Sequence, residues 1–514
     1  MNISSDPLPE LDPTLMEQLK ASRFEPLFEQ LKERLDRLEK ENRLLRELRR
    51  LELLKKYGAS GEQLCLEQLE LLELEPGVSQ EEVKVESDRE QLQLPLKAAR
   101  KHPGRQQLPA HLPRVEKIIR CTPEQCVCGQ CGKETSVIGY ELSEQLDVKP
   151  AQYFVVVTKR EKRACKGCEE QGVECAPVPV RIIEKGLASD RIVIDTVLSK
   201  YADHVPLYRQ SAILERETGI ELSRATLDSW VMQVGEMLKP ISKAMGQELL
   251  SGSYIQADET IVGVQTHDGR GKNHQAYLWQ YSRPGAMVVF DFRMGRERQG
   301  PKRFLDNFEG ILQSDGYGAY DHVGGKQIVH AACWAHARRK FFDAVKLSPT
   351  DQTSIRIVAQ INELFALDAQ QGLSQLDRQK VRLEKSKPLL EQIKKAIQAA
   401  RTDALPKSAL AKACDYTLTL WSRLSRFLEY PELELSNNVA ENSMRPIALG
   451  RKNWIHIGSQ EAGPRVAAIL SIVETCRRLS LPVRDYLGSV LPGLADFPAP
   501  RVAQLTPSAW AARS

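Results

Sequence analysis

The amino-acid sequence predicts a multidomain α/β protein, and three observations support this fold class. The chain has 514 residues, which exceeds the roughly 100 to 200 residues of one ordinary domain. Segments with the alternating pattern of β-strands gather after residue 250, between turn signals and helical segments. Seven of the eleven cysteines lie between residues 121 and 175. We therefore expect several folded units, one of them a mixed α/β domain.

The composition predicts a soluble protein of the cytoplasm. Hydrophobic residues make up 42% and charged residues 27% of the chain, and no apolar run reaches the roughly 18 to 20 residues that a membrane span needs. The first residues, MNISSDPLPELDPT, have acids where a signal peptide has basic residues. The formal net charge of +4 excludes a polycationic coat for nucleic acid but allows a local basic surface.

The region 24–75 is predicted to be helical and to oligomerise. Apolar residues and one asparagine recur there at spacings of three and four, at Phe28, Leu31, Leu35, Leu38, Asn42 and Leu45. Asn42 takes an a position, where its amide can pair with its copy in a parallel two-stranded coiled coil. The pattern thus predicts a homo-oligomer. The alternative is an amphipathic helix that packs within its own chain.

Residues 76–120 are predicted to form a linker. Residues 62–94 contain ten acids and two bases, whereas residues 97–120 contain seven bases, one acid and three prolines. The prolines and the scarcity of apolar periodicity argue against a compact fold. The basic half is suited to following DNA phosphates, and a solvated spacer explains the same charges equally well.

The cysteine cluster predicts a zinc ribbon over residues 121–178. Two Cys-x2-Cys turns, Cys128 with Cys131 and Cys165 with Cys168, are separated by 33 residues. Each turn presents two thiolates, so the two turns together supply one tetrahedral Zn²⁺ site, and four sulfur ligands make that zinc structural. Disulfides are the alternative, which the missing signal sequence and the odd number of cysteines disfavour.

Residues 187–245 are predicted to be helical. Pro206 can open a helix that ends near Glu217, Gly219 supplies a turn, and Ser223 can cap a second helix. The pair is compatible with a DNA-binding helix-turn-helix, with Arg224 as its clearest exposed base, and also with a plain helical hairpin.

The region after residue 250 predicts a ribonuclease-H-like domain with two neighbouring carboxylates. Its expected order is strand, strand, strand, helix, strand, and then a strand that leads into a helix at 328–345. In a ribonuclease-H-like sheet the first and fourth strands are neighbours, which would bring Asp258 and Asp315 together. Paired carboxylates repel unless a cation lies between them, and oxygen ligands favour Mg²⁺ or Mn²⁺. Glu259 and Asp321 are alternative acids at these positions.

Glu441 is the candidate for a third carboxylate. Asn437 or Asn438 can cap a short helix that has Glu441 in its first turn and ends near Pro446. An exposed ion pair between Glu441 and Arg445 is the alternative. Cys333 and His336 form a Cys-x2-His pair, which helical periodicity explains as well as metal binding does.

Five long motifs resemble the insertion sequence 66 family of transposases, within the DDE superfamily. They follow the family's order over most of the chain: CGQCGKETSVIGYELSEQLDVKPAQY, ADETIVGV, LQSDGYGAYD, CWAHARRKFFDA and NNVAENSMRPIALGRKNWIHIGS. Ser436 departs from the Asp that we expect before the two asparagines, and it leaves Glu441 in register.

The resemblance implies a DNA transposase that frees 3′-hydroxyls at the ends of a bacterial insertion sequence and joins them to target DNA. It implies that Asp258, Asp315 and Glu441 bind two Mg²⁺ (or Mn²⁺) ions, and that residues 346–430 are a helical insertion between 250–345 and 431–480 of the catalytic domain. It also implies that the zinc ribbon (121–178) binds DNA, with double-stranded DNA and small accessory proteins of the same element as partners, and that the protein associates with the nucleoid. Residues 481–514, rich in Pro and Ala, are assigned only as a tail.

Basic and aromatic residues near the acids are candidate DNA contacts. They are Arg338, Arg339, Arg445, Arg451, Lys452 and Trp454. The alternative for each single arginine is an ordinary solvated surface. Two other functions remain open at this point, namely a nuclease of the same fold that never joins strands, and a DNA-binding repressor whose catalytic fold has decayed.

Overall fold

The computed structural model describes residues 152–163, 174–184, 186–266, 273–369 and 374–513, together with isolated positions between 32 and 140. The chain divides into two compact units, of which one is Ser87–Ala176 and the other combines Met1–Glu86 with Pro177–Ser514. None of the helices among the described residues has both the length and the hydrophobicity that a membrane span requires.

The predicted coiled coil is described at only a few positions. Lys32, Arg34, Leu35, Leu38, Asn42 and Leu45 are all helical and exposed. Phe28 and Leu31 lie outside the described residues. Self-association through this helix therefore stays a prediction.

The unit Ser87–Ala176 contains a short antiparallel pair of strands, β1 (Lys162–Arg163) and β2 (Glu174–Cys175). Arg160 supports the pair, because its Nη1 donates to the carbonyl of Ala176 at 2.9 Å. The four predicted zinc ligands Cys128, Cys131, Cys165 and Cys168 lie outside the described residues, so the zinc site also stays a prediction.

Among residues 186–250 three helices precede the large sheet, and two of them begin close to the predicted residues. They are α5 (Asp190–Tyr201), α6 (Leu207–Thr218) and α7 (Arg224–Leu250). Gly219 ends α6 with a φ of 71°, a left-handed conformation that glycine adopts without strain. The Ser223 side chain accepts the N–H of Thr226 and so caps α7, as its position predicts.

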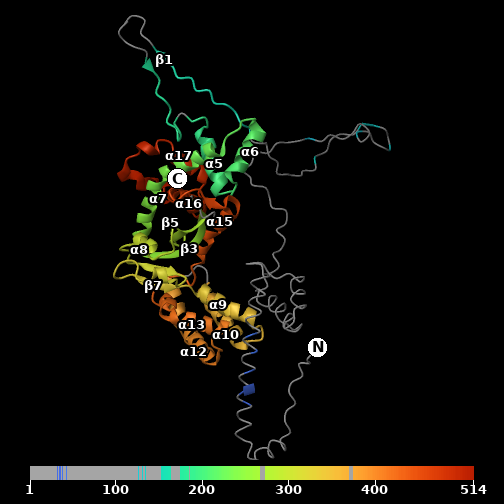
Figure 1. Ribbon diagram of the computed structural model, residues 1–514, viewed down its shortest axis with the longest axis vertical. Coiled ribbons are helices and arrows are strands. Elements are labelled where there is room, and N and C mark those ends of the chain that lie inside the picture. The colour runs from blue at the N-terminus through green and yellow to red at the C-terminus, as the bar shows by residue number, and fades with distance from the viewer. Residues whose placement is uncertain are drawn as a thin grey trace, which may run out of the picture. The chain divides into compact units, whose positions relative to one another are not determined.

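The large sheet has six strands in the order β5-β4-β3-β6-β7, with β8 paired to β3. Its strands are β3 (Tyr254–Val264), β4 (His274–Ser282), β5 (Val288–Arg293), β6 (Ile311–Ser314), β7 (Val329–Ala332) and β8 (His456–Ile457). Of these strands, β5, β3 and β7 are labelled in Figure 1. The first three are antiparallel neighbours, whereas β6 and β8 run parallel to β3, and β7 runs parallel to β6. The predicted pairing of the first and fourth strands is confirmed.

The connecting helices also follow the predicted order. Helix α8 (Gln299–Leu305) lies between β5 and β6, and α9 (Trp334–Leu347) follows β7 directly. One side of the sheet is covered by α16 (Ala462–Arg478), which packs on β5 and on α7. The approach is close, because a Cβ on Gly463 would lie 2.2 Å from the Phe292 ring. A larger residue at 463 would force the helix off the sheet.

A helical module separates α9 from the return of the chain to the sheet. It contains α10 (Gln352–Asp368), α11 (Gln375–Val381), a π-helical turn η3 (Arg382–Ser386), α12 (Lys387–Asp403), α13 (Ala409–Thr419) and α14 (Trp421–Leu424). In Figure 1 these helices form the yellow-to-orange group beside β7. Ile361 and Ile393 of this module pack into a hydrophobic core that also contains Trp334 and Phe341 of α9 and Ile311 of β6. The described part of 346–430 is thus helical, as the resemblance implies.

Arg382 is a fully buried cation in this module, with 0% of its side chain exposed. Its Nε lies 2.7 Å from Oδ1 of Asp368, and its other nitrogens donate to backbone carbonyls of Phe427, Tyr430 and Leu433. Arg378 also binds Asp368, at 2.7 Å. A buried guanidinium is stable only with such a complete set of partners.

Residues 481–513, assigned from sequence only as a tail, are part of the folded unit. They form α17 (Val483–Val490), two 3-10 turns and α18 (Pro507–Ala511). Tyr486, Leu487 and Leu491 are buried in the same hydrophobic core as α5 and α7. The Pro and Ala residues therefore belong to short packed helices.

Candidate active site

Asp258 and Asp315 lie at the same level of two neighbouring strands. β3 pairs with β6 in parallel, and the last partners in register are Gln256 and Gln313. Asp258 and Asp315 each lie two residues beyond these partners. Side chains two apart in a strand share a face, so Asp258 continues the face of Gln256, while Asp315 is the first residue after β6. Asp315 Oδ1 accepts the N–H of Tyr317 at 2.8 Å, which closes the turn after β6.

The carboxyl of Asp258 is buried among other acids. Burial, together with the charges of Glu259, Asp315 and Glu441, raises its pKa from 3.8 to about 7, although the hydrogen bond from the N–H of Glu259 lowers it. Asp315 and Glu441 therefore lie close enough to Asp258 for their charges to act on it. In the structure, the carboxylates of Asp315 and Glu441 are thus near enough to that of Asp258 to raise its pKa.

The raised pKa of Asp258 predicts a pH-dependent stability of the metal-free protein. Because the folded-state pKa of about 7 exceeds the ordinary 3.8, folding favours the protonated form. This contribution is complete below pH 3.8 and disappears as the pH rises through 7. Asp258→Asn should therefore be more stable than the wild type at pH 8 in EDTA, by up to about 4 kcal/mol, and the difference should shrink towards pH 4.

Denaturation between pH 4 and pH 8 in EDTA checks this prediction. Asp343→Asn, at an exposed position on α9, is the matched control and should follow the wild type at every pH. Mg²⁺ should raise the melting temperature of the wild type more than that of Asp258→Asn. If the free energies of unfolding of the wild type and of Asp258→Asn changed with pH in the same way, the raised pKa of Asp258 would be contradicted.

Glu441 is positioned by α15 (Asn438–Trp454), which packs on β3 and β4. Glu441 lies in the first turn, as predicted. The predicted end near Pro446 is wrong, because the helix continues through this proline to Trp454. Burial of Met444, Ile447 and Gly450 holds the later turns in place despite the missing N–H of the proline. The predicted cap is also wrong, since Asn437 is the N-cap residue but its side chain makes no capping bond.

The Glu441 carboxylate faces a histidine and an arginine from α9. Its Oε1 lies 3.6 Å from Nδ1 of His336, and its Oε2 lies 3.3 Å from Nη2 of Arg339. Burial lowers the pKa of His336, so the imidazole is neutral near pH 7. Within the described part of the chain, Glu441 Oε1 has no hydrogen-bond partner although it is buried. Such an oxygen is available to a cation.

A buried polar network, which the sequence did not predict, positions the segment before Glu441. Gln256 donates to Oε1 of Gln313 at 3.0 Å and to the carbonyl of Ser436 at 3.0 Å. Gln313 in turn donates to the carbonyl of Glu434 at 2.7 Å. The Tyr254 hydroxyl joins both amides. Polar residues at alternate positions of two strands were the available signal, since buried amides need fixed partners.

The alternative acids have other partners. Glu259 is almost fully buried, binds Arg296 at 2.6 Å and accepts the hydroxyl of Tyr320 at 2.8 Å. Asp321 lies 2.7 Å from Arg423. Both carboxylates are thus engaged in ion pairs, which favours Asp258 and Asp315 as the metal-binding pair.

Among the predicted DNA contacts, three make bonds within the chain. Arg338 bonds to the side chain of Asn362 on α10, and Arg339 binds Glu441. Arg451 donates to Oγ1 of Thr260 at 3.1 Å and to the carbonyl of Ile261 at 2.5 Å. On this edge of β3, strand β6 pairs with residues 254–256 and strand β8 pairs with residues 263 and 264. The carbonyl of Ile261 lies between these two pairings, and Arg451 supplies its hydrogen bond. Arg445 and Lys452 are exposed on α15.

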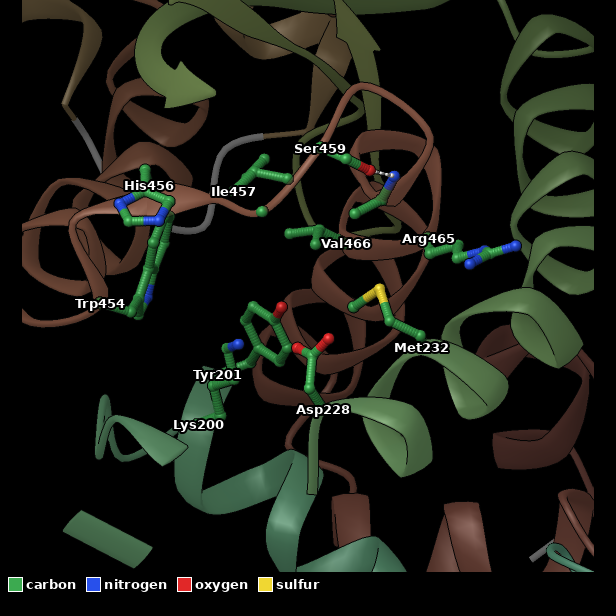
Figure 2. A pocket seen from close by; sticks show the side chains of 12 residues that line it. Lys200, Tyr201, Asp228, Met232, Trp454, His456, Ile457, Ser459, Arg465 and Val466 are labelled. Atoms are coloured by element: carbon green, nitrogen blue, oxygen red, sulfur yellow. Dashed lines mark hydrogen bonds between the residues drawn. The ribbon is translucent and has the colours of Figure 1, made fainter. Parts of the chain in front are cut away.

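Trp454 lines a cavity of about 340 Å³ at the far end of α15 (Figure 2). It meets Tyr201 edge to face at a centroid distance of 6.5 Å, and Lys200, His456 and Arg465 also line the cavity. Arg465 is paired with Glu236 at 2.7 Å. None of Asp258, Asp315 and Glu441 lines this cavity, so it is separate from the acidic site.

The donor set of the acidic site fits hard divalent cations. Asp258, Asp315 and Glu441 offer carboxylate oxygens, the donor type that Mg²⁺ and Mn²⁺ prefer. The raised pKa of Asp258 and the unpartnered Oε1 of Glu441 indicate uncompensated negative charge in the metal-free state. A bound cation would stabilise the charged form of Asp258 and would give Glu441 Oε1 a partner.

Three family models match the chain. Residues 185–465 match "Transposase IS66 family", residues 125–169 match "zinc-finger binding domain of transposase IS66", and residues 44–116 match "Transposase C of IS166 homeodomain". The second match contains all four predicted zinc ligands. The third begins within the predicted oligomerisation region and covers most of the predicted linker.

The relatives found among curated proteins come from Sinorhizobium fredii. Uncharacterized protein y4qI is 33% identical over 85% of this chain and 82% of its own length. Uncharacterized protein y4jD is 35% identical over 75% of this chain and 77% of its own. Uncharacterized protein y4hP is 30% identical over 86% and 83%, respectively. With the first family model covering more than half of its residues, the chain belongs to the IS66 family of transposases.

Proposed function

We propose that this chain is a DNA transposase that cleaves the ends of its insertion sequence and joins the freed 3′-hydroxyls to target DNA. The observation that supports this most directly is the electrostatic coupling of Asp258 to Asp315 and Glu441. The strand order β5-β4-β3-β6-β7, with three antiparallel strands and two parallel ones, supports a ribonuclease-H-like catalytic domain. The helical module between α9 and α15 is the insertion of that domain.

Each acid has a distinct structural support in this proposal. β3 holds Asp258 and the turn after β6 holds Asp315, so the rigid sheet fixes two of the ligands. The first turn of α15 brings Glu441 to them, and the Gln256–Gln313 network fixes where that helix begins. Two Mg²⁺ or Mn²⁺ ions bound by these carboxylates would supply Lewis acidity to the attacking and departing oxygens of a phosphodiester.

Basic residues near the acids are proposed to receive DNA. Arg339 is 57% exposed and already lies against Glu441, so it can exchange this carboxylate for a phosphate when cations bind. Arg445 and Lys452 extend a basic face along α15. We further propose that the zinc finger with one structural Zn²⁺ and the amino-terminal helix supply DNA binding and self-association. Small accessory proteins of the same element remain additional proposed partners.

The experiment is incubation of the purified full chain with labelled element ends, target plasmid and Mg²⁺. The proposal requires nicked ends and joined products, and EDTA should abolish both. Cleavage without joining would identify a nuclease and overturn the strand-transfer step. If the protein bound the element ends but did not cleave them in Mg²⁺ or Mn²⁺, the proposed enzymatic activity would be overturned and a DNA-binding repressor would be favoured.

A further inference from the structure

The second candidate metal site lies directly beside the acidic site. Ligand atoms of Cys333, His336 and Glu441 lie within 4.8 Å of one another. Cys333 is the N-cap residue of α9 and His336 lies in its first turn, while Glu441 lies in the first turn of α15. Two helix starts thus bring a sulfur, a nitrogen and an oxygen donor together.

Two of the three ligand atoms of this cluster lack hydrogen-bond partners that would explain their burial. Within the described residues, His336 Nδ1 and Glu441 Oε1 are buried without a hydrogen bond, and they lie 3.6 Å apart. In a tetrahedral site, bond lengths of about 2.0 Å separate a nitrogen and an oxygen ligand by about 3.3 Å, and a bond of about 2.3 Å to sulfur separates the sulfur from either by about 3.5 Å. The histidine and the glutamate are therefore within a few tenths of an ångström of the spacing of two ligands of one ion.

The sulfur also has the surroundings of a metal ligand. The N–H of Asn437 donates to Cys333 Sγ at 3.4 Å, and the start of α9 adds the positive end of a helix dipole. Burial raises the pKa of the Cys333 thiol to about 11, so the free thiol is protonated at neutral pH. Metal binding would replace this proton, which is released to solvent as the sulfur–metal bond forms.

We propose that Cys333, His336 and Glu441 bind Zn²⁺, and that this zinc withdraws Glu441 from the Mg²⁺ site. Thiolate and imidazole select Zn²⁺ over Mg²⁺, which takes oxygen ligands. The side chains of His336 and Glu441 are 19% and 26% exposed, which gives the ion a path of entry. The regulatory part rests on the proposed function, because it assigns Glu441 to the Mg²⁺ ions of the transposase. Zinc would then act as an inhibitor of cleavage.

Zinc content tests the binding part without any activity measurement. The full chain is equilibrated with excess Zn²⁺ under reducing conditions, freed of unbound ion by gel filtration, and analysed by mass spectrometry for zinc per chain. Cys333→Ala and His336→Gln should each contain one zinc fewer than the wild type. Cys414→Ala removes another fully buried cysteine, outside this cluster, and should keep the wild-type content. Equal zinc in the wild type and both cluster variants, each folded by circular dichroism, would overturn the site.

A Zn²⁺ titration at constant Mg²⁺ tests the competition for Glu441. Cleavage of labelled ends by the wild type should be lost as Zn²⁺ rises, whereas cleavage by Cys333→Ala should persist at the same concentrations. If zinc bound through Cys333 but did not inhibit cleavage, the proposal that zinc withdraws Glu441 from the Mg²⁺ site would be overturned. A wild type that fails to cleave in Mg²⁺ alone contradicts the proposed transposase, and the zinc content still decides whether the site exists.

Discussion

Asp258→Asn should abolish Mg²⁺-dependent cleavage while binding to the element ends is retained. Asparagine keeps the size of the side chain but removes the charge that would hold two cations beside Asp315 and Glu441. Loss of a ligand of this kind forfeits several kcal/mol of transition-state stabilisation, which corresponds to a rate reduction of about 10³-fold or more. Gel-based cleavage of labelled ends measures the rate, and a mobility shift measures the binding.

Asp321→Asn is the matched control for this prediction. Asp321 was an alternative acid in the sequence, and in the structure it is paired with Arg423. Its replacement should leave the cleavage rate within a few-fold of the wild type. Near-wild-type cleavage by Asp258→Asn, or a stronger loss in Asp321→Asn, would show that the metal-binding acids are assigned wrongly.

Asp368→Ala should strongly destabilise the helical insertion. The change leaves Arg382 with 0% exposure and no carboxylate partner, and it removes one of the two carboxylate partners of Arg378. Removal of one member of a buried ion pair costs about 3 to 5 kcal/mol, because the remaining charge stays desolvated. Urea denaturation followed by circular dichroism should show an earlier transition. The transition should coincide with loss of protease resistance between residues 346 and 430.

Asp415→Ala tests whether burial, and not ion pairing as such, produces this effect. Asp415 binds Arg401 at 2.5 Å in the same module, but 57% of the aspartate side chain is exposed. Water replaces the lost partner at such a site, so the transition should hardly move. Equal shifts in both variants would contradict the structural role given to the buried pair.

The sheet and its acids were predictable because local patterns determine them. Alternating residues mark β3, β4 and β5, and side chains two apart on parallel neighbours place Asp258 level with Asp315. Helix boundaries with strong local signals, such as Ser223 and Gly219, were also predicted well. The length of α15 was not, because packing against β3 and β4 outweighs the local effect of Pro446.

The surroundings of the acids depend on contacts that are distant in sequence. Glu441 meets His336 and Arg339 only because the chain returns to the sheet beside α9 after the helical module. In the same way, the partners of Gln256 and Gln313 lie at Glu434 and Ser436, far along the chain. The hydrophobic periodicity of a sequence does not indicate contacts between residues that are so far apart along the chain. The burial of Arg382 likewise arises because η3 meets α10 and the segment 427–433, and a charged residue in a polar stretch does not indicate this in the sequence.

Because α15 is one continuous helix, it fixes the direction of the Glu441 side chain relative to that of the Trp454 side chain. Glu441 and Trp454 are thirteen residues apart on one helix, which separates them by about 20 Å along the axis. Each residue inserted or deleted between them would turn one end against the other by about 100°. Substitutions on the solvent side of this rod are compatible with the fold, but a change in its length by one residue would point either the carboxylate or the indole in the wrong direction.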